Sequence, residues 1–259
     1  MSKHTVNNKN FYLWYEEFVD NAKIKGLPHS TNIIIYDSVK GDRVPGTWSL
    51  YIPNNHDNSS SDKYPLPAEL YMEISGRDKV SFDFLGWAHN LMLVSESMLE
   101  FLQDLGMLDG YDVSKLMVVN RKLKVKETEK KYFALRFLYS DIQLIDLNRA
   151  DTLDVHPIQT SVWYRYLLFK NMCIKKDTDK HLFVLNDLDI LKYIHSGDAL
   201  PLTEDVHILM REHKIRFVPF SKTLIFTEKI KNLLDKRNFV TPRIYAMAEL
   251  HKAFELQEK

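Results

Sequence analysis

Residues 91–106 read LMLVSESMLEFLQDLG and join a short apolar run to an amphipathic pattern. The run 91–94 is typical of a buried strand. Ser95 can accept a hydrogen bond from an unpaired amide of a first helical turn, and Glu96 places negative charge at the positive end of that helix. Gly106 predicts where the helix ends. The apolar positions between them share one helical face, and they are Met98, Phe101, Leu102 and Leu105.

The same arrangement recurs in the C-terminal third of the chain. The apolar run 224–226 leads into Thr227 and Glu228, and the apolar residues Ile230, Leu233 and Leu234 follow at the spacing seen after Ser95. Two strand-cap-helix units are therefore predicted, with Ser95 and Thr227 as helix N-caps. Residues 181–192 resemble these units more weakly, because their apolar spacing slips by one. Since any strand that enters a capped helix shows this pattern, the sequence leaves open whether the two similar halves arose by duplication.

The rest of the chain indicates short strands joined by turns. Apolar residues spaced between Phe11 and Phe18, with Trp14 and Tyr15, predict an amphipathic helix that ends by Gly26. Residues 54–67 are rich in Asn, Asp and Ser and hold two prolines, so we expect a long exposed loop there. It divides an N-terminal region, 1–80, from an α/β region, 81–259, although the two could form one continuous domain. Further expected elements are strands at 33–36, 48–52, 69–74, 80–85, 115–119, 123–125, 132–138 and 143–147 and a helix at 186–194.

These patterns predict an α/β protein of mixed α+β type, with a mixed or antiparallel sheet. In 259 residues, 45% hydrophobic content supplies a core, and the single cysteine, Cys173, cannot form an intramolecular disulfide, so we expect a reducing, cytoplasmic location. No signal pattern and no apolar run of about 20 residues points to a membrane. Thirty-five basic residues balance thirty-five acidic ones, which argues against a nucleic-acid partner. The sequence holds no signal for or against a homo-oligomer.

Motifs that bind phosphate or metal ions are not found. Residues 41–47 have the glycine spacing of a phosphate-binding loop, but they lack its lysine, and Pro45 has no amide to donate. His207 and His213 are six residues apart, so on a helix they would point about 120° apart. We therefore expect no cofactor and no metal ion.

Catalytic groups are not indicated either. No glycine-rich loop stands near the acidic pairs Asp177 with Asp179 and Asp187 with Asp189 to complete a phosphoryl-transfer site, and Asp187 suits the first turn of a helix. Cys173 lies between apolar neighbours without an adjacent histidine, which predicts a buried, inert thiol. The chain is therefore not expected to be an enzyme, and no catalytic residue is assigned.

Two segments are candidates for contact with a macromolecule. Residues 121–126, RKLKVK, alternate basic and apolar side chains, so a strand there would present lysines on one face to an acidic partner or an RNA backbone. Lysines also protect exposed edge strands, which is the interpretation we favour. The run Trp163-Tyr164-Arg165-Tyr166 combines the residue types most enriched in interface hot spots. These four are the candidate partner-binding residues, although burial in the core is an alternative.

Several apolar strands and helix starts along the chain form a recognisable series. Phe82-Asp83-Phe84-Leu85 precedes the run 91–94 and its Ser-Glu helix start, and the later segments are Lys131-Tyr132-Phe133-Ala134-Leu135, Ile145-Asp146-Leu147 and Leu182-Phe183-Val184. Over about residues 80–235 this series resembles the forty-third immunity-protein family of bacterial polymorphic toxin systems. The first 80 residues and residues 242–259 do not contribute to the resemblance.

The resemblance implies a cytoplasmic immunity protein of interbacterial competition that binds a cognate toxin domain and neutralises it. It identifies no contact residues, because the shared positions are core and cap positions. Two alternatives stay open: an enzyme whose site is assembled from scattered carboxylates and histidines, and an RNA-binding module that uses Lys122, Lys124 and Lys126 with Tyr132 and Phe133.

Overall fold

The structure, a computed structural model of the chain, describes residues 10–14, 24–28, 32–38, 45–51, 62–74, 80–86, 91–106, 110–146, 152–155, 165–169, 173–174, 178–184, 215–218 and 224–250. Two helices and several sheets, mixed and antiparallel, confirm the predicted α+β class. Within these ranges, no helix combines the length and apolarity needed to cross a membrane.

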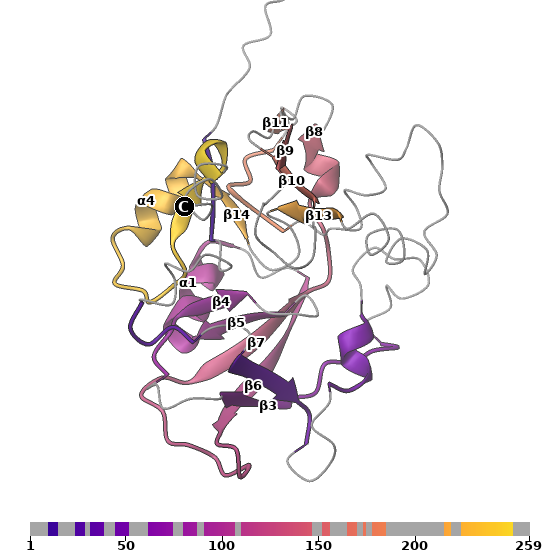
Figure 1. Ribbon diagram of the computed structural model, residues 1–259, viewed down its shortest axis with the longest axis vertical. Helices are drawn as coiled ribbons and strands as arrows, with labels where there is room; N and C mark the ends of the chain where they lie inside the picture. The colour runs from indigo at the N-terminus through magenta and orange to yellow at the C-terminus, as the bar shows by residue number, and fades with distance from the viewer. Residues whose placement is uncertain are drawn as a thin grey trace, which may run out of the picture.

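A six-stranded sheet forms the largest element and makes the lower half of the molecule in Figure 1. Its order is β2-β3-β6-β7-β5-β4, and all neighbours are antiparallel except β3 and β6. The sheet takes strands from both sides of residue 80. The strands are β2 (Ile33–Tyr36), β3 (Glu69–Ile74), β4 (Phe84–Gly86), β5 (Leu91–Ser95), β6 (Tyr111–Val119) and β7 (Tyr132–Phe137).

The two faces of this sheet bury different side chains, because side chains alternate along a strand. One face holds Leu70, Leu116 and Ala134, which join a cluster with Trp48 and Phe82. The opposite face is covered at β5 and β7 by helix α1 (Glu96–Asp104). The sheet is therefore buried on both faces at its β5 end.

Helix α1 begins and ends as its sequence predicts. The Ser95 hydroxyl accepts a hydrogen bond from the Met98 amide at 3.2 Å, which confirms the N-cap. Gly106 has a φ of +70°, and its amide donates to the Gln103 carbonyl at 2.8 Å. Few residues other than glycine adopt that backbone conformation, so Gly106 closes the helix.

A second, four-stranded sheet in the order β12-β14-β1-β15 joins segments from both ends of the chain. Strand β1 lies between β14 and β15 and is antiparallel to both. Helix α4 follows β14 directly, and Figure 1 shows the two together above the six-stranded sheet. The elements are β1 (Phe11–Trp14), β12 (Leu182–Phe183), β14 (Ile225–Thr227), α4 (Glu228–Leu234) and β15 (Ile244–Ala246).

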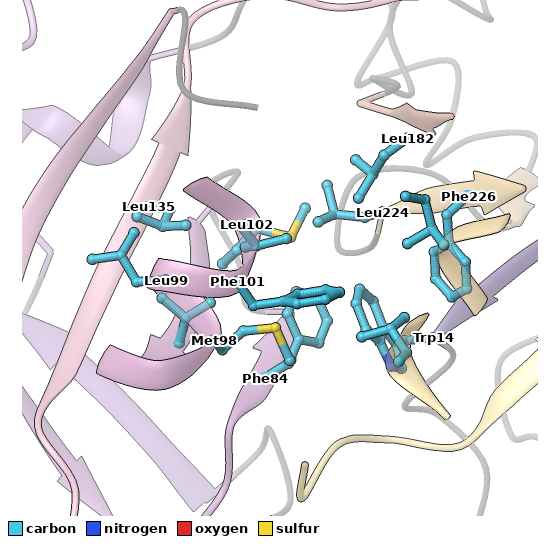
Figure 2. Packing of buried hydrophobic residues seen from close by; sticks show 14 of the residues in the cluster. Trp14, Phe84, Met98, Leu99, Phe101, Leu102, Leu135, Leu182, Leu224 and Phe226 are labelled. Carbon is cyan, nitrogen blue, oxygen red and sulfur yellow. The ribbon is translucent and has the colours of Figure 1, made fainter. Parts of the chain in front are cut away.

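An apolar cluster joins this second sheet to α1, and we call it the central cluster. Trp14 of β1 stacks on Phe84 of β4 with ring centroids 4.0 Å apart, and it also contacts Phe226 of β14. Figure 2 shows side chains of α1 and of the four-stranded sheet pointing toward one another across this space. The residues shown and labelled are Trp14, Phe84, Met98, Leu99, Phe101, Leu102, Leu135, Leu182, Leu224 and Phe226.

Two small sheets complete the described structure. In one, β10 is central, parallel to β13 and antiparallel to β9, and in the other β8 and β11 form an antiparallel pair. Three 3-10 turns are also present. These elements are β8 (Ile145–Asp146), β9 (Thr152–Val155), β10 (Arg165–Phe169), β11 (Cys173–Ile174), β13 (Ile215–Val218), η3 (Thr47–Leu50), η4 (Ile142–Leu144) and η6 (Met247–Glu249).

The amphipathic helix expected from Phe11 and Trp14 is wrong, because these residues lie in strand β1. The strand pairs on both edges, and aromatic side chains on both of its faces are buried: Phe11 contacts Phe183 edge-on and Trp14 enters the central cluster. Burial on both faces removes the alternation by which a strand is recognised, so the helical spacing was misleading. Tyr15 and Phe18 lie outside the described residues.

Other differences concern short elements. The strand expected at 48–52 is the turn η3, where the Ser49 amide and hydroxyl both donate to the Gly46 carbonyl. The strand expected at 80–85 is ordered as a strand only from Phe84 onward, and that at 143–147 is the turn η4 followed by two residues of β8. The helix expected at 186–194 lies outside the described residues, as does most of the loop 54–67.

Candidate partner-binding surface

Asp83 is a buried carboxylate that joins four parts of the chain. Its Oδ1 accepts hydrogen bonds from the Ser95 hydroxyl at 2.5 Å and, more weakly, from Ser97, and its Oδ2 accepts from Lys130 Nζ at 2.6 Å and from the Val240 amide at 2.8 Å. Lys130 also donates to the Ser81 carbonyl. Both oxygens are occupied, so Asp83 acts as a structural anchor rather than as an acid or a base.

Asp141 is a second buried carboxylate with the same arrangement. Lys180 Nζ donates to its Oδ1 at 2.6 Å, and the Val184 amide donates to its Oδ2 at 2.8 Å. The Asp141 amide in turn donates to the Val184 carbonyl. The contacts therefore fasten β12 to the end of β7, and they leave neither oxygen free for chemistry.

Arg136 of β7 is a fully buried cation. It pairs with Asp112 of β6, donates to the Tyr64 carbonyl at 2.7 Å and lies over the ring of Tyr51 at 4.4 Å from the centroid. Burial raises the pKa of Tyr51, while the nearby guanidinium acts in the opposite direction. This cluster holds the loop residues Tyr51 and Tyr64 against the sheet.

One part of the six-stranded sheet is left uncovered, and we call it the open face. It lies on the α1 side of the sheet, at β2, β3 and β6, where the helix does not reach. Ile34 is 40% exposed there and Val113 is 49% exposed. The residues of the open face are Ile34, Glu69, Tyr71, Val113, Lys115 and Met117.

Polar contacts on the open face are local. Tyr71 donates to Glu69 at 2.7 Å, and this hydrogen bond is the main cause of a raised Tyr71 pKa. Lys115 Nζ lies 3.6 Å from the other oxygen of Glu69. The sequence holds no clear signal for this face, because along β6 the buried Ser114 is polar while the exposed Val113 is apolar. The exposed apolar side chains of this face are of the kind that a protein partner can cover.

The basic run at 121–126 forms a hairpin, and the strand expected at 123–125 is wrong. We call residues 119–126 the basic hairpin. Val119 and Val125 form an isolated bridge, the Asn120 amide donates to the Lys124 carbonyl at 3.0 Å, and Leu123 has a φ of +60°. Because the backbone turns at Leu123, its side chain and that of Val125 do not share a strand face.

The four predicted partner-binding residues are only partly described. Trp163 and Tyr164 lie outside the described residues. The backbone of Arg165 and Tyr166 belongs to β10, where Tyr166 is paired with Arg216 on one side and with Val155 on the other. Their role in binding therefore stays a prediction.

Most of the residues considered for chemistry lie outside the described part of the chain. These are Asp177, Asp187, Asp189, His207 and His213. Cys173 lies in β11 and is half-buried, rather than buried as expected. Across the described ranges, no group of three or more His, Cys, Asp or Glu side chains is close enough to hold a metal ion.

Comparison with known protein families places the chain beside one of them. A family model described as Immunity protein 43 matches residues 19–200, which is well over half of the chain. No curated protein matches the chain. The match includes the six-stranded sheet and the basic hairpin. It begins earlier than the resemblance noted in the sequence, and it ends before β14 and α4, so the second strand-cap-helix unit lies outside it.

Proposed function

The chain belongs to the immunity protein 43 family, and we propose from this that it binds a cognate bacterial toxin domain in the cytoplasm and neutralises it. The observation that carries the proposal is the family match over residues 19–200. An inhibitor of this kind acts by covering a functional surface of its partner through shape and charge complementarity. It needs no catalytic residue of its own.

The described residues supply surfaces suited to that role. The buried carboxylates Asp83 and Asp141 are both engaged in ion pairs and backbone hydrogen bonds. The open face and the basic hairpin, by contrast, have exposed side chains that a partner can cover. We propose the predicted residues Trp163, Tyr164, Arg165 and Tyr166 as further contacts, on their composition alone.

The RNA-binding alternative receives less support. It needs aromatic rings on which bases can stack next to the lysines. Tyr132 is 2% exposed and packs on Phe82, and Phe133 packs against the central cluster on the other side of the sheet. These rings serve the core, so the hairpin lysines lack a stacking surface at these positions.

Co-expression with the toxin domain encoded beside this gene tests the proposal. We expect the chain to restore growth to cells that produce the toxin domain, and to co-purify with it as a one-to-one complex. Protection before the toxin acts requires nanomolar affinity or tighter, which corresponds to at least about 12 kcal/mol at a one-molar standard state.

An unrelated cytosolic protein expressed at the same level serves as the control. Absence of both rescue and co-purification contradicts the proposal. If the chain instead turns over a small molecule, the enzyme alternative replaces it.

A further inference from the structure

The basic hairpin concentrates exposed positive charge. Arg121, Lys122 and Lys124 are exposed, and Lys126 is half-buried. Among the described residues, no carboxylate pairs with the hairpin's three lysines. Elsewhere in the described structure several lysines do have a carboxylate partner, and these are Lys115, Lys130, Lys131, Lys180 and Lys231. The three hairpin lysines are therefore available to a partner.

The tip of the hairpin is held in one shape. The Asn120 side-chain oxygen accepts hydrogen bonds from the amides of Lys122 at 2.8 Å and Lys124 at 3.1 Å. The Leu123 amide donates to the Asn120 carbonyl, and the Lys126 amide donates to Val118. A segment that is ordered before binding loses less conformational entropy when a partner covers it.

Protection of a sheet edge does not explain these lysines. Strands β6 and β7, which the hairpin connects, are both internal: β6 also pairs with β3, and β7 also pairs with β5. In Figure 1 the connection projects below the six-stranded sheet at the bottom of the view. Val125 adds an apolar side chain that is 56% exposed. A partner that covers Val125 therefore lies beside the hairpin lysines.

We propose that the basic hairpin docks on an acidic surface of the toxin domain, an inference that rests on the proposed function. The hairpin lies within the family match, and its cations call for carboxylates opposite them. Of the neighbouring aromatic residues, Tyr132 is buried and Phe133 packs against the central cluster, so they do not form a stacking surface for RNA bases. Such complementary charge acts mainly on the rate at which two proteins associate.

The test compares two variants with the same change in charge. The first variant, Lys122→Glu with Lys124→Glu, reverses the charge of two hairpin lysines. The second, Lys229→Glu with Lys236→Glu, reverses the charge of two exposed lysines in and just after α4, outside the family match. Association with the purified toxin domain is measured over a range of salt concentrations. At low salt we expect the association rate of the hairpin variant to be lower than that of wild type by a factor of about ten or more, and to depend less on salt concentration. The α4 variant should associate at the wild-type rate.

Each outcome decides between the two proposals. If wild type binds and both variants bind equally well, or are weakened equally, the hairpin proposal is overturned while the proposed function stands. If wild type does not bind the toxin domain, both are overturned. If wild type binds a labelled oligouridine and only this binding is lost in the hairpin variant, the surface belongs to RNA and the hairpin proposal is overturned.

Thermal unfolding of each variant checks that it is folded. Should charge reversal unfold the hairpin variant, Lys122→Gln with Lys124→Gln is measured instead, with a smaller effect in the same direction supporting the proposal and no effect overturning it.

Discussion

The two strand-cap-helix units look alike in sequence but use their cap residues differently. Ser95 and Thr227 each end a buried strand and precede a helix. The Ser95 hydroxyl accepts from the Met98 amide and donates to Asp83. The Thr227 hydroxyl makes no cap hydrogen bond and lies instead 2.9 Å from His181 Nδ1 on the neighbouring strand segment. A local pattern thus predicts where a helix starts, while the side chain that lies opposite decides what the cap hydroxyl does.

The largest expected effect is at Asp83, which contacts the cap residue of the first unit and not that of the second. Asp83→Ala removes the acceptor of Ser95, Lys130 and the Val240 amide, so we expect the free energy of unfolding to fall by about 3 kcal/mol or more. Asp235→Ala in the second unit removes an exposed i,i+4 ion pair with Lys231 and should cost about 0.5 kcal/mol or less. Urea denaturation measures both, and equal losses would show that the Asp83 contacts do not distinguish the units.

A smaller difference is expected between the two cap hydroxyls. Ser95→Ala removes a helix cap and a hydrogen bond to a buried carboxylate, at a cost of about 2 kcal/mol. Thr227→Val keeps the side-chain shape and removes only the contact with His181, at about 1 kcal/mol. If the two denaturation midpoints shift equally, the Thr227 hydroxyl also caps its helix in solution.

The smallest effect concerns Tyr132, which is paired with Ser95 across β5 and β7. Burial, followed by the charges of Asp83 and Glu129, raises the Tyr132 pKa above its usual 10.0. The unfolded chain therefore loses the phenol proton first, and this contribution to stability, complete below about pH 10, is lost as the pH rises further.

The variant Tyr132→Phe isolates that contribution. At neutral pH we expect a change within about 0.5 kcal/mol, because the hydroxyl has no hydrogen-bond partner among the described residues. Above pH 10 the variant should lose less stability than wild type in the same urea titration. Parallel curves for the two proteins would assign the alkaline sensitivity to other groups.

Local features of the fold were predictable from sequence. The bounds of the strands Ile33–Tyr36 and Glu69–Ile74 were predicted to the residue. Ser95 and Gly106 mark the two ends of α1 as expected. These elements carry their own signals, namely a β-branched run, alternation, a cap hydroxyl and a left-handed glycine. Features that depend on distant partners were missed, and strand β1 is the clearest, because both of its neighbours come from the C-terminal third.

The candidate surface was predictable only in its composition. The sequence identified the basic residues at 121–126, but it placed them on an edge strand, because nothing local shows that β6 and β7 are internal. The left-handed backbone of Leu123, which makes the turn, is rare for a leucine, and the contacts of Asn120 help to hold it. The open face depends on where α1 stops covering the sheet, which is a property of packing.

The position of β1 between β14 and β15 has a consequence for how the protein is made. Phe11–Trp14 leaves the ribosome before its two partner strands, which end at Thr227 and Ala246. At about 5–20 residues per second, β1 waits on the order of ten seconds or more with both edges unpaired. A nascent chain that has already completed the six-stranded sheet thus still carries an unpaired, aromatic strand, which is a natural binding site for chaperones that protect chains during translation.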